Sequence, residues 1–281
     1  MDALKNELSL PDLKMLNDSL KKCYGYNFNN YALSSFKRRV ARFMQLEKIK
    51  DTQELIQKVV ENDKLYGRFL EEITVNTTEM FRFPSMWKLL RNEVLPALKY
   101  KKNIRIWHVG CSSGEEVYSM SILIKELSLD SNVSAVATDI NEEVIQSAKK
   151  GVYSSRNIET HRTNYSASGG LSELSHYYKL SDDGAKFKMD DALLKNVKFY
   201  KHNLIVDSNF GKFDLILCRN VLIYFDKILQ EQVFQMLLKS LNPSGFLVLG
   251  SKESMIWSAT SDKYNIVNNN CKVFRLKDSN V

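Results

Sequence analysis

The residues best suited to chemistry lie around a short turn bounded by glycines. An apolar run over 104–109 predicts a buried strand, which leads into a turn of small residues from Gly110 to Gly114. Glu115 and Glu116 follow at once and open an amphipathic helix that extends to Leu127. A strand, a glycine turn and a helix in this order form the first unit of a nucleotide-binding α/β sheet. A ligand can approach such a turn closely, because glycine has no Cβ atom.

The acidic residues near this turn restrict the ligand that it can hold. A carboxylate would repel a pyrophosphate, whereas it suits a cofactor with a ribose and a positive charge, and S-adenosylmethionine fits that description. A second predicted strand, 133–139, ends in Asp139, beside the first turn of a right-handed β-α-β unit. Asp139 can accept hydrogen bonds from ribose hydroxyls there. Alternatively, Asp139 caps the helix that starts near Glu142, although Asn141 could cap that helix instead.

Composition and residue spacing exclude several classes of protein. The 281 residues are enough for one large or two modest domains. No apolar run reaches the length of a membrane span, and the amino terminus lacks a signal-peptide pattern. The four cysteines and four histidines match no metal-site or disulfide pattern. His108 and His202 alternate with apolar residues, which predicts ordinary sheet side chains. We therefore expect a cytoplasmic protein with no bound metal and no membrane insertion.

The chain is expected to be helical first and α/β afterwards. Helical periodicity continues to about residue 100, with predicted helices from Pro11, over Ser34–Leu46, over Thr52–Val60 and over Leu65–Glu72. From Asn103 onward, predicted strands alternate with helices, which implies a mainly parallel sheet. These strands are 104–109, 133–139, 197–202, 213–218, 245–249 and 271–276.

A long stretch between about Lys150 and Val197 departs from this alternation. Within it, alternating residues over 177–189 flank Asp183 and Gly184, a strong signal for a two-residue hairpin turn. A hairpin in a long crossover often carries function. It can equally be a solvent-exposed insertion, and the residues alone favour neither.

Basic residues gather in one predicted helix and just after it. The stretch from Phe36 to Lys50 contains one acid, Glu47, and six basic residues: Lys37, Arg38, Arg39, Arg42, Lys48 and Lys50. Arg38, Arg39 and Arg42 can share one helical face. Such a face binds nucleic acid, a membrane surface or an acidic protein, or it is only solvated. No aromatic residues interleave on the basic side, which argues against stacking on single-stranded nucleic acid.

Two further segments combine polar side chains with predicted strand or helix ends. The segment Asn76–Arg82 contains three hydrogen-bonding side chains and an arginine, although Thr77 or Thr78 could simply cap a helix. The second segment, 213–225, is a buried strand that ends in Arg219 and Asn220. A polar pair at the carboxyl end of a central strand faces the ligand crevice of such a sheet.

Together these motifs resemble the chemotaxis receptor methyltransferases, the CheR-type family. The resemblance covers nearly the whole chain, in both order and spacing, and is carried by Asn76–Arg82, Gly114–Ser119, Thr138–Ile140, His202–Leu204 and Cys218–Phe225. It implies an all-helical domain over 1–75, a linker and the start of the cofactor site over 76–102, and a Rossmann-like methyltransferase domain over 103–281. A small β subdomain is expected within the last of these, at about 160–195.

The resemblance also implies an activity and its residues. The expected enzyme is an S-adenosylmethionine-dependent protein-glutamate O-methyltransferase that acts on the cytoplasmic helices of a chemoreceptor. The family's cofactor contacts correspond to Asn76, Thr78, Arg82, Glu116, Asp139, Asn203, Leu204, Asn220 and Val221. The alternatives are a methyltransferase with another acceptor and a non-catalytic adaptor that binds the cofactor or a receptor.

The chemistry predicts two catalytic residues. A glutamate carboxylate is already ionised near neutral pH, so it needs no general base, and orientation of the reacting groups can supply most of the catalysis. Arg82 is expected to hold the substrate carboxylate or the methionyl end of the cofactor through a bidentate contact. Tyr224 is expected to position the incoming group.

The family comparison also predicts the contact with the receptor. Arg38, Arg39 and Arg42 correspond to a receptor-facing helix, and no nucleic-acid partner is expected. Phe43 stands where the family has another arginine. The hairpin looks shorter than in members that grip a receptor's tail peptide, which argues against tail binding. The segment Gly250–Glu253 departs from the family pattern Gly-His-Ser-Glu, so no role is assigned to it.

Overall fold

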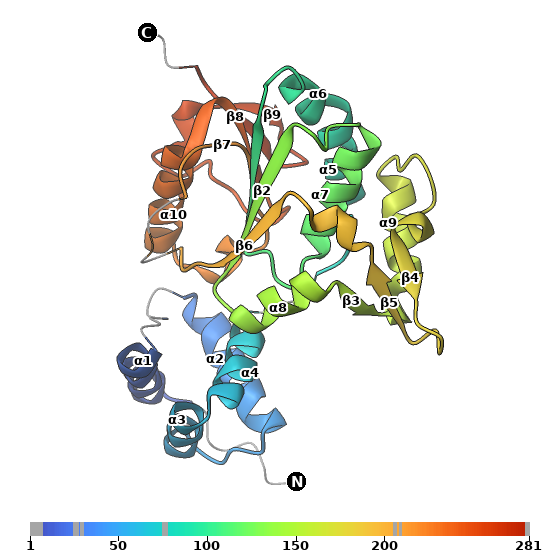
Figure 1. Cartoon of the computed structure of the whole chain (residues 1–281). Coiled ribbons are helices and arrows are strands. Elements are labelled where there is room, and N and C mark those ends of the chain that lie inside the picture. Colours follow the sequence, from blue (N-terminus) through green and yellow to red (C-terminus); the bar gives the residue numbers. More distant parts are fainter. Residues whose placement is uncertain are drawn as a thin grey trace. The chain divides into compact units, whose positions relative to one another are not determined.

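The chain forms two compact units, one helical and one built on a β-sheet. Figure 1 shows the computed structural model, which describes residues 8–24, 28, 31–74, 78–204, 207 and 210–278. The helical unit comprises Met1–Asn76 together with Ile223–Gln230, and the sheet unit comprises Thr77–Leu222 and Glu231–Val281. Residues 223–230 therefore belong to the helical unit although they follow a strand of the sheet.

In the described residues up to Thr74, the helical unit contains four helices, as the periodicity predicted. They are α1 (Leu10–Tyr24), α2 (Leu33–Leu46), α3 (Thr52–Glu61) and α4 (Asp63–Thr74). Buried apolar side chains such as Leu16, Val40 and Phe69 form its core. Among the helices within the described residues, none is long and apolar enough to cross a membrane.

The sheet unit is built on seven strands. In space their order is β6 (Val197–Lys201), β2 (Val133–Asp139), β1 (Ile104–Val109), β7 (Phe213–Cys218), β8 (Leu241–Leu249), β10 (Val273–Leu276) and β9 (Tyr264–Asn268). The five strands from β6 to β8 are parallel, and β10 is antiparallel to both its neighbours. The strand order reverses between β1 and β7, so the topological switch point of the sheet lies between these strands.

The predicted strands are present, with small shifts at their ends. All six predicted segments form strands, although β8 begins at Leu241 rather than at residue 245. Strand β10 begins at Val273 rather than at residue 271, because Cys271 and Lys272 form a turn. Strand β9 was not predicted. It pairs only with β10 at the edge of the sheet. Its five residues include polar Asn265 and Asn268 and the exposed apolar residue Ile266. An edge strand of this composition lacks the clear alternation of a half-buried strand.

Helices cover both faces of the sheet, as a doubly wound fold requires. The helical segments of this unit include α5 (Pro84–Leu89), a π-helical turn (Leu90–Val94), α6 (Leu95–Leu98), α7 (Glu115–Glu126) and α8 (Glu142–Lys150). Helix α10 (Lys227–Ser240) begins in the helical unit and continues in this one. In Figure 1, α10 lies on the opposite side of the sheet from α5 and α7.

A small second sheet is inserted between α8 and β6. It contains β3 (Val152–Ser154), β5 (Lys186–Met189) and β4 (Tyr178–Leu180), in that spatial order and with antiparallel pairing, and α9 (Ile158–Ala167) lies between β3 and β4 in the chain. The hairpin over 177–189 is confirmed, with Gly184 in its loop at φ +66°, but the loop spans 181–185 and is longer than the predicted two-residue turn. The first strand, β3, precedes the predicted range of about 160–195. It is three residues long and mostly exposed, too short for a periodic pattern.

Candidate functional site

Several of the predicted cofactor residues lie where four parallel strands, β1, β2, β6 and β7, end. The turn after β1 is joined to β2, because the Cys111 N–H donates to the Thr138 carbonyl at 2.9 Å. The segment after β6 is joined to β2 in the same way, by a bond of 2.8 Å from His202 N–H to the Asp139 carbonyl. Asn203 and Leu204 therefore begin beside Asp139. This edge is where ligands bind in open α/β sheets.

Gly110 allows the loop after β7 to approach the turn after β1. Its φ is +66°, and a Cβ atom at this position would lie 2.5 Å from Cγ2 of Val221. Any larger side chain would therefore displace Val221. The contact places Val221 and its neighbour Asn220 at the switch point between β1 and β7. Asn220 itself has φ +60°, a conformation that residues other than glycine seldom adopt.

Asp139 does not cap the next helix. Asn141 is the N-cap of α8, because its side chain accepts from the Glu143 N–H at 2.9 Å. The Asp139 carboxylate instead accepts from the N–H groups of Ser112, at 2.9 Å, and Asn141, at 3.0 Å. Burial raises the pKa of Asp139, against the lowering effect of these backbone donors. Each carboxylate oxygen retains a further lone pair, so Asp139 can still accept from ribose hydroxyls.

Glu116 is held by two side chains whose contacts with it the sequence did not predict. Its two oxygens lie 2.9 Å from His108 Nδ1 and 2.9 Å from Arg219 Nη1. Burial opposes ionisation of Glu116, but the His108 hydrogen bond and the Arg219 charge together hold its pKa below the usual value. Arg219 also donates to the Arg82 carbonyl at 2.8 Å. His108 is thus not an ordinary sheet side chain. His108 lies one residue before the end of a predicted strand, and this position is the feature of the sequence that could have predicted its contact with Glu116.

The segment around Arg82 has a strained backbone. Phe81 and Phe83 have φ values of +53° and +65°, which are unusual for bulky residues. The segment is fixed from both sides, since the Phe81 N–H donates to Ser119 Oγ at 2.9 Å and Trp87 Nε1 donates to the Arg82 carbonyl at 3.1 Å. Such outliers cluster at functional sites, where the surrounding structure holds them. Arg82 is therefore presented from a fixed backbone.

Not every predicted site residue falls in this group. Thr78 lies in the same unit and is half-buried, whereas Asn76 lies outside the described residues. Tyr224 belongs to the helical unit. Its carbonyl accepts from the Ala32 N–H at 2.8 Å, and the Arg39 guanidinium lies 5.5 Å from the centre of its ring. Its catalytic role therefore stays a prediction.

The three arginines of α2 differ in their surroundings. Arg38 is exposed, and Arg42 is 65% exposed and lies 3.4 Å from Glu72. Arg39 is half-buried and donates to the Glu72 carbonyl at 3.0 Å, besides its contact with Tyr224. The expectation that all three form one solvated docking face therefore fits Arg38 and Arg42 better than Arg39, which contributes to the packing of its own unit.

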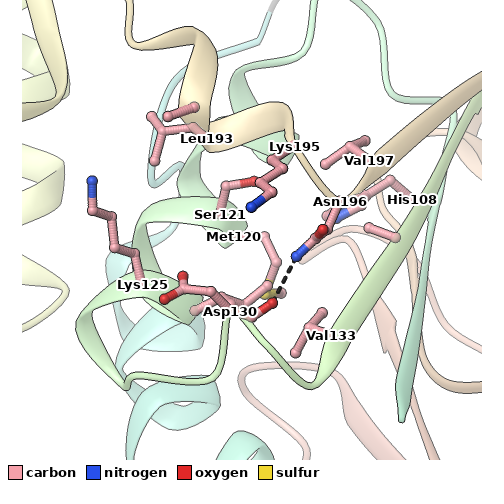
Figure 2. Close-up of a pocket in the computed structure, with 13 residues that line it drawn as sticks. His108, Met120, Ser121, Lys125, Asp130, Val133, Leu193, Lys195, Asn196 and Val197 are labelled. Carbon is pink, nitrogen blue, oxygen red and sulfur yellow. Dashed lines mark hydrogen bonds between the residues drawn. The ribbon is translucent and has the colours of Figure 1, made fainter.

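A cleft of about 210 Å³ lies elsewhere in the sheet unit, between α7 and the segment that leads into β6 (Figure 2). Val133 and Val197, the first residues of β2 and β6, line it, and Asn196 Nδ2 donates to the Asp130 carbonyl beside it at 2.6 Å. No predicted cofactor residue lines this cleft. Most of its lining lies towards the amino ends of the strands, whereas Asp139 and Asn220 lie at the carboxyl ends of β2 and β7.

The charges and unpaired polar atoms at the carboxyl edge fit S-adenosylmethionine. Glu116 and Asp139 border the turn, and Glu115, the first residue of α7, is buried beside it with a pKa that burial raises to about 7. Within the described part of the chain, Ser112 Oγ and Arg219 Nε are buried without a hydrogen-bond partner. An acidic, glycine-bounded turn suits a ribose and a sulfonium and disfavours a pyrophosphate. The described residues contain no group of histidine, cysteine and acidic side chains that could hold a metal ion.

A doubly wound sheet with this cofactor edge defines an S-adenosylmethionine-dependent methyltransferase. Comparison with protein families supports the class and refines it. The model "CheR methyltransferase, SAM binding domain" matches residues 76–272, and "CheR methyltransferase, all-alpha domain" matches residues 11–74. The chain belongs to the CheR methyltransferase family, and its cofactor is S-adenosylmethionine.

Curated relatives match most of this chain and most of their own length. A Pseudomonas putida protein, provisionally named methyltransferase Cher3, is 38% identical over 94% of this chain and 96% of its own length. Chemotaxis protein methyltransferase 1 of Vibrio cholerae is 33% identical over 78% of this chain and 80% of its own. The chemotaxis protein methyltransferase of Borreliella burgdorferi is 30% identical over 91% and 94%, respectively.

Proposed function

We propose that this protein transfers a methyl group from S-adenosylmethionine to glutamate side chains on the cytoplasmic helices of a chemoreceptor. Membership of the CheR methyltransferase family and the names of the Vibrio cholerae and Borreliella burgdorferi relatives support this acceptor. The observation that carries the proposal is the linked group of Glu116, Arg219 and Arg82 at the carboxyl edge of the sheet. The acceptor helices imply that the reaction takes place in the cytoplasm.

The proposed reaction needs orientation rather than proton transfer. When bound, the cofactor supplies a methyl group on a positively charged sulfur, and its transfer to a carboxylate oxygen yields a methyl ester and S-adenosylhomocysteine. We assign the ribose hydroxyls to Asp139, which is buried and already aligned by two backbone donors. We assign further cofactor contacts to Glu116 and to the loop of Asn220 and Val221. Asn76, Thr78, Asn203 and Leu204 complete the proposed set.

Arg82 is the proposed orienting residue. A guanidinium can donate two parallel hydrogen bonds to one carboxylate, which fixes both position and angle. The left-handed residues on either side of Arg82 hold its backbone in place, so less freedom is lost when the reacting groups are aligned. Tyr224 is proposed to position the incoming group.

A methyltransferase with another protein acceptor is the second candidate. The Pseudomonas putida relative favours it, because the name of that protein specifies a methyltransferase and does not mention chemotaxis. Its identity to this chain, 38%, is also higher than that of the Vibrio cholerae and Borreliella burgdorferi relatives. The cofactor edge would be the same in both cases. Only the acceptor and its docking surface would differ.

A methyl-transfer assay distinguishes these functions. The full chain is incubated with tritium-labelled S-adenosylmethionine and receptor-containing membranes, and membranes without receptors serve as the control. Carboxyl methyl esters release volatile methanol in base, so base-labile counts on the receptor support the proposal. Base-labile counts on another protein would favour the second candidate. Binding of the cofactor without any transfer would indicate a non-catalytic adaptor.

A further inference from the structure

A single buried carboxylate organises the loop that contains Asn220 and Val221. Glu253, which is 4% exposed, accepts hydrogen bonds from four backbone N–H groups. The donors are Asn220 at 3.0 Å, Val221 at 2.9 Å, Leu222 at 2.7 Å and Gly250 at 2.6 Å. Successive N–H groups that converge in this way normally form an anion-binding concavity. Here the protein's own carboxylate fills it.

Gly250 makes this arrangement possible. A Cβ atom at Gly250 would lie 2.7 Å from Glu253 Oε2 and 2.8 Å from the Asn220 nitrogen. The end of β8 therefore approaches the loop after β7 more closely than any other residue would allow. Gly250 and Glu253 together hold this loop in place: Gly250 permits the close approach, and Glu253 accepts the hydrogen bonds.

Val221 connects Glu253 to the glycine turn after β1. The N–H of Val221 is bonded to Glu253, and its side chain lies against Gly110 in the turn after β1. The same loop holds Asn220 at φ +60°, in the left-handed region that asparagine adopts more readily than most residues. If the four donors lost their acceptor, Asn220 and Val221 would be free to move away from the switch point.

We propose that Glu253 is a positioning residue for cofactor binding, because its carboxylate fixes the backbone of Asn220 and Val221 against the glycine turn. This inference rests on the proposed cofactor contacts of these two residues. It assigns a role to the segment Gly250–Glu253 for which the sequence suggested none.

The test is the affinity for S-adenosylmethionine, measured by calorimetry on the full chain. Glu253→Gln keeps the size of the side chain but replaces one accepting oxygen with a donor, so two of the four N–H groups lose their partner. We expect the dissociation constant to rise about tenfold, or about 1.4 kcal/mol, because Asn220 and Val221 are no longer held against the glycine turn before the cofactor binds. Glu253→Asp keeps both oxygens and should retain more affinity than Glu253→Gln.

Asp214→Asn is the matched control. Asp214, in β7, is 2% exposed and accepts from the Arg105 N–H at 2.9 Å, from Lys101 Nζ at 2.6 Å and from Asn242 Nδ2 at 2.9 Å. It is buried and bonded much as Glu253 is, but it lies near the amino ends of β1 and β7. Its substitution should lower the melting temperature and leave the affinity for the cofactor unchanged.

The possible results separate this inference from the proposed function. Weaker binding in both Glu253 variants, with the control unchanged, supports the positioning role, whichever acceptor the enzyme methylates. A folded Glu253→Gln variant with wild-type affinity overturns it. Failure of both Glu253 variants to fold, while Asp214→Asn folds, also overturns it by making Glu253 a requirement of the fold. A wild-type protein that binds the cofactor but methylates no receptor contradicts only the proposed acceptor.

Discussion

Replacement of Glu115 by glutamine should stabilise the protein, and more so at high pH. Glu115 is 7% exposed, and its burial raises its pKa from 4.5 to about 7. The folded protein therefore holds this proton over a range in which the unfolded chain has already released it. Stability is lost as the pH rises from about 4.5 to about 7, and the full cost remains above that range. Glu115→Gln removes the charge, while its amide oxygen can still accept from Ser113 Oγ.

The size of the effect follows from the two pKa values. A gap of about 2.5 pH units, at 1.36 kcal/mol per unit, corresponds to about 3 kcal/mol. We therefore expect Glu115→Gln to raise the free energy of unfolding by about 3 kcal/mol at pH 8. The gain should fall to about 1 kcal/mol at pH 5.5, where much of the folded protein's Glu115 is already neutral.

Urea unfolding at the two pH values, without cofactor, measures this difference. The three tryptophans, Trp87, Trp107 and Trp257, all belong to the sheet unit, so their fluorescence reports on the unit that contains Glu115. Glu142→Gln is the control, because Glu142 is exposed in the first turn of α8 and should have little effect at either pH. A gain from Glu115→Gln that is equal at pH 5.5 and pH 8, or no gain at all, would refute the reasoning.

Three further predictions concern the proposed function. Asp139→Ala should weaken S-adenosylmethionine binding by roughly 1–3 kcal/mol, the range for hydrogen bonds to a charged group, and unchanged calorimetric affinity would exclude the ribose contact. Arg82→Ala should reduce methyl transfer strongly without loss of the fold, and Arg82→Lys should restore little, since lysine lacks the planar fork; wild-type turnover in the lysine variant would contradict the bidentate role. Reversal of Arg38 and Arg42 to glutamate should raise the Michaelis constant for receptor and leave cofactor affinity unchanged, and wild-type activity should fall with salt because exposed charges are screened within about 10 Å at 0.1 M ionic strength. Arg39 is left intact in that variant because it donates to the Glu72 carbonyl. If the protein bound an arbitrary DNA duplex in a salt-sensitive way, and the reversal left receptor methylation unaffected, the basic face would instead bind nucleic acid.

Local patterns in the sequence were sufficient for the elements and for part of the cofactor edge. The apolar run before Gly110 and the acid that ends the strand over 133–139 are properties of residues close together in the chain. Strand periodicity places such residues at a strand end, and the handedness of β-α-β units places two successive strand ends side by side. Asp139 could therefore be placed beside the turn before any contact was known. The choice between Asp139 and Asn141 as helix cap needed the hydrogen bonds themselves.

The tertiary structure alone decided which distant residues complete the site. Arg219 meets Glu116 across 103 positions in the chain, and Glu253 meets Asn220 across 33. Neither pair lies within the reach of a periodic pattern, because both depend on β7 pairing with β1 on one side and with β8 on the other. Strand order brings a buried carboxylate to the donors that it needs, and such an acid has no local signature that separates it from an exposed one. The sequence thus determined the sheet and the acid at the end of its second strand, whereas the order of the strands determined which side chains hold the loops at its carboxyl edge in place.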